Sequence, residues 1–345
     1  MSVKCLFVLI LSLLFLNAEI TAQQKPHYTQ YMLNQYILNP ALTGIEDYSD
    51  IRLSHRIQWD GFRGAPVTSY LTANTSLGKR SNGNSASSVF SEDENPAVQK
   101  KWNEDDYIDP YHGIGIQLVN DVIGPFSHFS GNLTYAYHMS INSTTRLSGG
   151  LGLGFNRYGI NTGKLDFGNN LVTDPVTAQQ AILNGKVRMD LNAGLWLYRN
   201  NFFAGLAIHQ LVPQLNEVIN INTPLFDSRN VPHYFFTAGY NINPYSEVRF
   251  IPSVMLKYIP GTPVQADLNV KAQFTNSLFL GASYRSGYGF AGITGFAINN
   301  KLLISYSYDY TNTLLNQVSN GSHEIMIGFR LSKSDYSVPC PVGIW

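Results

Sequence analysis

The feature that most constrains the fold of this chain is an alternation of apolar and polar side chains that recurs along most of its length. Residues Val264 to Phe274 carry apolar or small side chains at every even position, with Gln, Asp, Asn or Lys between them. Successive side chains of a β-strand point to opposite faces of the sheet. The segment therefore predicts a strand with one apolar face and one polar face.

The same alternation predicts fourteen strands, each bounded by Gly, Pro, Asn or Asp and long enough to cross a bilayer when tilted. An even number of strands returns the chain to the side from which it started. The sequence thus predicts an all-β fold, a transmembrane antiparallel β-barrel of about 14 strands over residues 49–331, with a short N-terminal helical or periplasmic segment. The predicted strands are residues 50–59, 66–77, 111–121, 128–141, 145–156, 187–198, 201–210, 234–243, 247–259, 264–275, 278–286, 289–298, 302–311 and 322–331.

The first 22 residues predict a cleavable secretory signal. Lys4 precedes an apolar run from Cys5 to Leu16, and Ala22 supplies the small residue expected at the cleavage site. The run is shorter than the roughly 20 residues of a transmembrane helix. Charged residues make up only 13% of the chain, against about 25% in typical soluble domains, and aromatic residues are abundant. We therefore expect export, contact with lipid and insertion into the outer membrane.

The charged residues of the predicted strands lie on their polar faces, which should line the lumen. A basic residue in the middle of the lipid would cost about 2–4 kcal/mol. Nine of these residues are basic and four are acidic. This positive bias could favour an acidic partner or an anion in the lumen, although ion pairing across the lumen is the simpler interpretation. We expect Arg285, Asp309 and Glu324, on neighbouring strands, to form a buried charge network. The full set is Arg52, Arg56, Arg146, Arg188, Asp190, Arg249, Lys257, Asp267, Lys271, Arg285, Asp309, Glu324 and Arg330.

Three segments lie outside the predicted wall. Residues 23–48 have helix-like spacing that stops at Asn39-Pro40, and they are expected to form a plug against the inner wall or a periplasmic segment at the rim. Residues 78–110 form a long, polar, acidic loop, and residues 332–345 form a tail. Glycines on the polar faces, such as Gly150, would leave room for a plug, but strand curvature explains them equally well.

Several classes of function lack their sequence signals. A net charge of zero without a basic stripe gives no nucleic-acid footprint. Cys340 is the single cysteine left after signal removal, so an intramolecular disulfide is excluded. Gly287 to Gly292 matches G-x-G-x-x-G, but an alternating segment follows instead of the helix that a dinucleotide site needs. No nucleophile has a suitably placed base, and no histidine has metal-ligand spacing. We expect no catalytic residue, metal or cofactor.

More specific residues carry a family resemblance. They include Gln30-Tyr31-Met32, Asn39 to Gly44, Arg56 to Thr68, Gly281 to Arg285, Tyr306 to Asp309 and Ser322 to Ile325. This set resembles the PorP/SprF family of type IX secretion and gliding-motility membrane proteins of Bacteroidetes, over essentially the whole mature chain. The chain departs from the family pattern in its long 78–110 loop and in its ending, Cys340 to Trp345.

The resemblance implies a non-enzymatic outer-membrane component of the secretion and motility pathway. Such a barrel would bind a periplasmic partner or hold an exported adhesin at the surface through the adhesin's C-terminal domain. The alternative is a porin for small anionic solutes, which an open lumen would favour and a plugged lumen would not. The residues expected to bind a partner are Tyr31, Asn39, Pro40, Arg56, Trp59 and Phe62.

Overall fold

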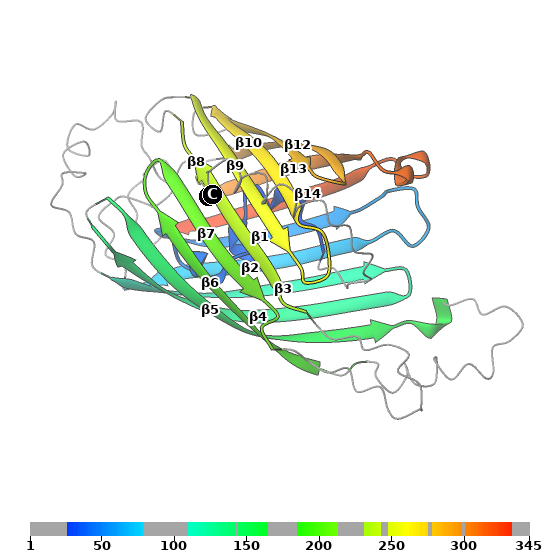
Figure 1. The fold of residues 1–345 in the computed structure, drawn as a ribbon, viewed down its shortest axis with the longest axis horizontal. Helices are drawn as coiled ribbons and strands as arrows, with labels where there is room; N and C mark the ends of the chain where they lie inside the picture. Colours follow the sequence, from blue (N-terminus) through cyan, green and yellow to red (C-terminus); the bar gives the residue numbers. More distant parts are fainter. Residues whose placement is uncertain are drawn as a thin grey trace, which may run out of the picture.

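The computed structural model describes residues 26–78, 110–142, 144–164, 185, 187–212, 231–242, 248–274, 278–298 and 301–332. The predicted signal at 1–22, nearly all of the acidic 78–110 loop and the tail after Ser332 lie outside these residues. Within them, fourteen antiparallel strands form one closed barrel, in which each strand pairs with its neighbours in sequence (Figure 1). β1 pairs with β14 and closes the wall. The predicted fold class is confirmed.

The strands agree with the alternating segments of the sequence to within a few residues at most ends. The largest difference is in β5, which continues four residues past its predicted end at 156, so that Ile160 pairs with Phe126 of β4. The strands are β1 (Tyr48–Ile57), β2 (Val67–Leu77), β3 (Tyr111–Ile123), β4 (Phe126–Ser140), β5 (Arg146–Ile160), β6 (Val187–Tyr198), β7 (Phe202–His209), β8 (His233–Tyr240), β9 (Val248–Tyr258), β10 (Gln265–Phe274), β11 (Leu278–Arg285), β12 (Gly289–Ile298), β13 (Leu302–Thr311) and β14 (Ser322–Ser332).

The alternation separates a lipid-facing surface from a lumen, as β10 illustrates. Asp267 and Lys271 are buried inside the barrel, whereas Leu268 and Val270 on the same strand are 55% and 44% exposed on the outside. Because lipid offers no hydrogen-bonding partner, the closed wall also satisfies the backbone groups of every strand. The G-x-G-x-x-G match falls in the tight β11–β12 hairpin, where Gly287 has a φ of 72°.

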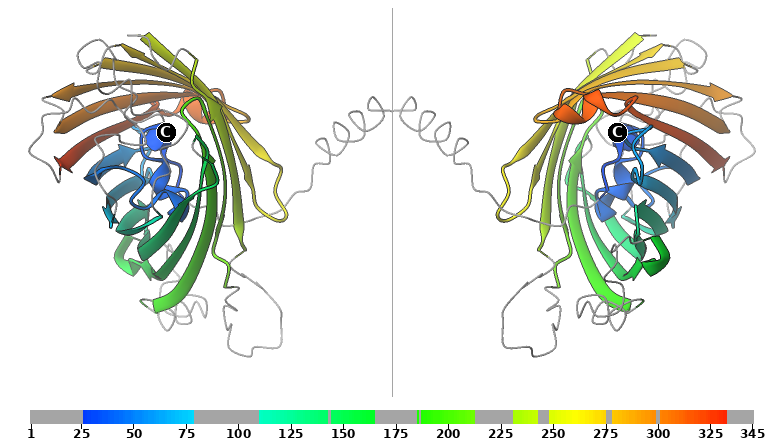
Figure 2. Two further views of the ribbon diagram at one scale, coloured as in Figure 1. Left: turned by 90° about the vertical axis from the view of Figure 1, so that its left-hand side faces the viewer. Right: turned by 90° about the vertical axis from the view of Figure 1, so that its right-hand side faces the viewer.

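Residues 26–46, called the plug below, lie inside the barrel (Figure 2). Every residue from 29 to 46 is buried. The plug contains three short 3-10 turns, η1 (Thr29–Met32), η2 (Gln35–Ile37) and η3 (Pro40–Leu42), in place of a regular helix. Two more 3-10 turns, η6 (Thr162–Lys164) and η7 (Leu314–Gln317), lie between strands. No helix among the described residues is long and apolar enough to cross a membrane.

Glycines of the wall make room for the plug at specific points. A Cβ atom on Gly113 would overlap the backbone of Thr43, and one on Gly150 would overlap the backbone of Pro40 and Ala41. Gly152 differs, since its Cβ would meet only side chains of the wall, at 3.4 Å. Room for the plug therefore accounts for Gly150 but not for Gly152, although both lie on the same face of β5.

This difference predicts the outcome of a matched pair of substitutions on one face of one strand. Gly150→Ala should displace the η3 turn and lower the free energy of unfolding by about 1–3 kcal/mol, the usual cost of overpacking. Gly152→Ala should be close to neutral. Unfolding midpoints of the two variants in detergent, followed by gel mobility of unheated samples, would measure the difference. Equal midpoints would contradict close contact between the plug and β5.

Candidate functional site

The residues expected to bind a partner fall into two groups. Tyr31, Asn39 and Pro40 belong to the plug and Arg56 to β1, and all four are buried in the lumen. Trp59 and Phe62 lie in the turn after β1, and Phe62 is 46% exposed. Partner binding by these residues stays a prediction, but the first group would become accessible only if the plug moved.

Arg56 is the centre of a buried polar cluster that also contains Thr29, Asp309 and Glu324, called the Arg56 cluster below. Arg56 Nη2 donates to Asp309 Oδ2 at 2.6 Å, and Arg56 Nη1 lies 3.6 Å from Glu324 Oε2. Arg56 Nη1 also donates to the hydroxyl of Thr29 at 2.5 Å, and that hydroxyl donates to Asp309 Oδ2 at 2.6 Å. The cation thus faces two carboxylates, and a plug hydroxyl bridges it to one of them.

The plug is attached to the wall at the seam where the barrel closes. Arg56 of β1 and Glu324 of β14 are direct partners in the pairing of these strands. Glu324 accepts from the backbone N–H of Thr29 at 2.8 Å and from Ser54 Oγ at 2.9 Å, while its carbonyl accepts from Gln30 Nε2 at 2.8 Å. The Arg56 cluster therefore joins the first strand, the last strand and the start of the plug.

Arg285 takes a different partner from the one that its grouping with Asp309 and Glu324 suggested. Its Nε donates to Asp267 Oδ2 at 3.0 Å, and its guanidinium lies 5.3 Å from the ring centre of Tyr288. Arg285 is still close enough to Asp309 for an electrostatic interaction. The sequence analysis placed Asp267 and Arg56 in the lumen, but the sequence held no signal for the register that brings them to these partners.

Asn39 and Pro40 position the middle of the plug. The Asn39 side chain accepts from the N–H of Ala41 at 2.9 Å, which begins η3, and its Nδ2 donates to the carbonyls of Leu195 and Leu206 at 3.1 and 3.2 Å. One amide thus fixes the turn and connects it to β6 and β7. Pro40 suits the first position of η3, where no N–H is needed.

Further polar contacts follow the plug along the lumen. Tyr31 accepts from Asn269 Nδ2 at 2.7 Å, and the Tyr36 hydroxyl lies 2.6 Å from Thr134 Oγ1. Gln117 donates to the Tyr36 carbonyl at 2.6 Å. These bonds satisfy backbone and side-chain groups of the plug that burial removes from water.

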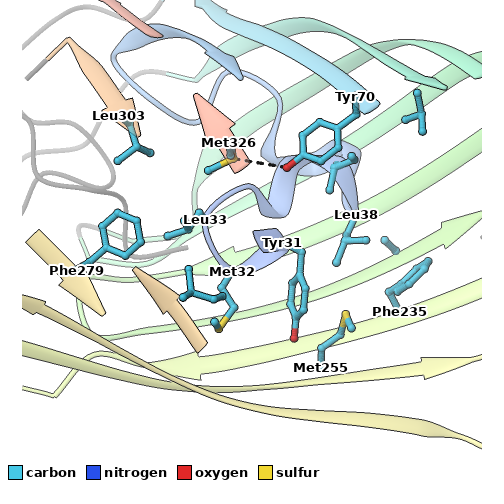
Figure 3. Packing of buried hydrophobic residues seen from close by; sticks show 14 of the residues in the cluster. Tyr31, Met32, Leu33, Leu38, Tyr70, Phe235, Met255, Phe279, Leu303 and Met326 are labelled. Carbon is cyan, nitrogen blue, oxygen red and sulfur yellow. Dashed lines mark hydrogen bonds between the residues drawn. The ribbon is translucent and has the colours of Figure 1, made fainter. Parts of the chain in front are cut away.

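The plug also contributes an apolar core inside the lumen (Figure 3). Tyr31, Met32, Leu33 and Leu38 pack among lumen-facing side chains from many strands, and the Tyr70 hydroxyl donates to Met326 Sδ at 3.5 Å. The wall residues labelled with them are Tyr70, Phe235, Met255, Phe279, Leu303 and Met326. Apolar side chains that line this part of the lumen are thereby covered by the plug.

A small cavity lies beside the start of the plug. It is lined by Pro26, His27 and Tyr28 and by wall residues such as Lys257 and Arg285. Its volume is only about 50 Å³. His27 stacks on Tyr288 with ring centres 6.1 Å apart. Burial, followed by the positive charges of Arg285, Lys257 and Arg56, lowers the pKa of His27 well below its usual 6.5. Among the described residues, no group of three or more His, Cys, Asp or Glu could hold a metal ion.

Comparison with known proteins decides what kind of barrel this is. Residues 20–329 match the family described as type IX secretion system membrane protein PorP/SprF. The chain belongs to the PorP/SprF family. Family and fold together assign this PorP/SprF barrel to the outer membrane. Members of the family are membrane components of the secretion system, and the family is not a known enzyme family. No curated protein matches the sequence.

Solved outer-membrane barrels share the architecture of this PorP/SprF barrel at low identity. The monoaromatic hydrocarbon channel CymD has a TM-score of 0.50 and 11% identity, with 91% of this chain and 94% of that chain covered. The outer membrane protein Omp33 of Acinetobacter baumannii has a TM-score of 0.45 and 10% identity, covering 84% of this chain and all of its own. At such identity the likeness extends to the fold alone.

The Arg56 cluster makes a testable prediction for this PorP/SprF barrel. Thr29→Val removes the hydroxyl that Arg56 and Asp309 share, at a cost of about 1–3 kcal/mol for unsatisfied buried groups. The plug should then become more sensitive to chymotrypsin at its tyrosines, with the fragments identified by mass spectrometry. Thr294→Val, on the exposed face of β12, is the control. Identical cleavage patterns would show that this hydroxyl does not hold the plug.

The position of His27 predicts a dependence on pH. Because its pKa in the folded protein lies below that in the unfolded chain, the unfolded state takes up a proton first as the pH falls through about 6.5. The contribution of His27 to stability is therefore present above this pH and is lost below it. Unfolding midpoints should fall more steeply between about pH 7 and 5 for the wild type than for His27→Gln. Parallel curves would contradict the prediction.

Proposed function

We propose that this PorP/SprF barrel is a plugged, non-enzymatic component that binds a protein of the type IX pathway. The partner is a periplasmic component or the C-terminal domain of an exported adhesin that the barrel holds at the surface. The observation that carries the proposal is the continuous burial of residues 29–46 in the lumen. A small-solute porin needs an open lumen, so the same observation weighs against that alternative.

The contacts of the plug support a stable seat over its whole length. The Arg56 cluster holds its start, Asn39 holds its middle, and the N–H of Gly44 donates to Asn74 Oδ1 at 3.0 Å near its end. Breaking a buried ion pair such as Arg56–Asp309 by removing one partner costs about 3–5 kcal/mol. A plug held in this way favours a role in which the outer surfaces of the barrel, and not its lumen, meet the partner.

The turn between β1 and β2 is a suitable surface for the second of these partners, the C-terminal domain of an exported adhesin. The N–H of Asp60 donates to the Gly321 carbonyl at 2.8 Å, and the N–H of Asn320 donates to the Asp60 carbonyl at 2.7 Å. These bonds fix the turn against the β13–β14 connection, where Val318 is 57% exposed beside the turn that carries Phe62. An exposed aromatic ring on a turn that backbone hydrogen bonds hold in place is the kind of feature that protein interfaces use as an anchor.

The test is to recover tagged barrel from native membranes and identify the proteins that accompany it. Phe62→Ala should reduce the recovered type IX protein several-fold, whereas Phe290→Ala, which removes a 56% exposed ring from the outer face of β12, should not. The same preparations should be electrically silent in planar bilayers. Barrel recovered alone, together with steady ion conductance, would reject this proposal in favour of the porin.

A further inference from the structure

The two rims of the barrel differ in which parts of the chain they carry. β1 begins at Tyr48 and β14 ends at Ser332, and these two residues are paired, so both ends of the wall lie at one rim, called the terminal rim below. The opposite rim, called the loop rim, carries the connections 58–66, 161–186, 210–232 and 312–321. At the terminal rim most connections are short, such as 141–145 and 199–201, and the acidic 78–110 loop is the exception.

The plug crosses the lumen from one rim to the other. Its last residues are at the terminal rim, where the carbonyl of Ile45 accepts from the Tyr111 hydroxyl at 3.4 Å just before β1 begins. Its first residues are near the loop rim, because Thr29 contacts Asp309 close to the end of β13. His27 stacks on Tyr288 in the β11–β12 turn, which belongs to the loop rim.

Pro26, the first described residue of the plug, therefore lies near the rim opposite to the one where the wall starts and ends. Outer-membrane barrels keep short turns on the periplasmic side and longer loops outside the cell. By this rule, and because both ends of the wall lie together, the terminal rim faces the periplasm. We propose that the amino-terminal end of the plug crosses the lumen and is presented at the cell surface.

This end of the plug lies next to the turn that carries Phe62. Ser322 Oγ accepts from the N–H of Trp59 at 3.1 Å and lies 3.3 Å from the Tyr288 hydroxyl, on whose ring His27 stacks. Ser322 thus connects the β1–β2 turn with Tyr288, the residue on which His27 stacks. A protein bound at this turn from outside the cell would meet the start of the plug. The topology itself does not depend on the proposed function, because no partner enters the argument.

Thiol labelling on intact cells tests the topology. In a Cys340→Ser background, a single cysteine is introduced by Pro26→Cys, by Arg63→Cys at the loop rim or by Arg199→Cys at the terminal rim. Both arginines are exposed. A membrane-impermeant maleimide should label Pro26→Cys and Arg63→Cys on intact cells. It should label Arg199→Cys only after the outer membrane has been permeabilised. An epitope inserted before Pro26, detected by antibody on intact cells, gives a second measurement.

Three results would overturn the proposal. Labelling of Pro26→Cys only after permeabilisation, together with Arg199→Cys, would place the amino-terminal end in the periplasm. Labelling of Arg199→Cys on intact cells, with protection of Arg63→Cys, would show that the barrel has the opposite orientation in the outer membrane. Absence of both the thiol and the epitope signal at the Pro26 position on intact cells would show that this end is not at the surface. None of these results bears on whether a type IX protein co-purifies.

Discussion

The guanidinium of Arg56, buried at the seam of the barrel, is the group on which the rest of the structure depends. A buried cation is tolerated only when opposite charges and hydrogen bonds compensate for the lost water. Asp309 from β13 and Glu324 from β14 supply the charges, and the plug supplies a further acceptor through Thr29. Arg56 therefore has all three of these partners only when the wall is closed and the plug is seated. Closure of the wall and seating of the plug are thus coupled through the Arg56 side chain.

The wall could be read from the sequence because its pattern is local. A two-residue period states both that a segment is a strand and which face is buried, so β10 was found over 264–275 and lies at Gln265–Phe274. Strand pairing is not local in the same sense. Arg285 bonds to Asp267 because the antiparallel register places these two residues opposite each other, and no residue pattern within either strand encodes that register.

The plug shows a second limit on what the sequence pattern can predict. The spacing of Tyr31, Met32, Gln35 and Tyr36 predicted helical structure, and the segment does turn, but in 3-10 pieces of three or four residues. Its polar groups bond to the wall as well as to one another, as in the donation from Gln117 to the Tyr36 carbonyl. A peptide bound along its length by another surface has little need of a continuous helix. The contacts that shape this segment come from strands far away in sequence.

The order in which the chain is synthesised also bears on how the seam between β1 and β14 closes. The plug is synthesised before any strand of the wall, and the last strand to be made is the one that pairs with β1. A finished barrel would leave no lateral opening through which residues 26–46 could enter, so they would have to be threaded end-on along the lumen. The simplest sequence of events is that the wall curls around a segment already in place. Assembly would then end in a single cooperative step, in which β14 reaches β1 and Glu324 meets Arg56 and Thr29 together.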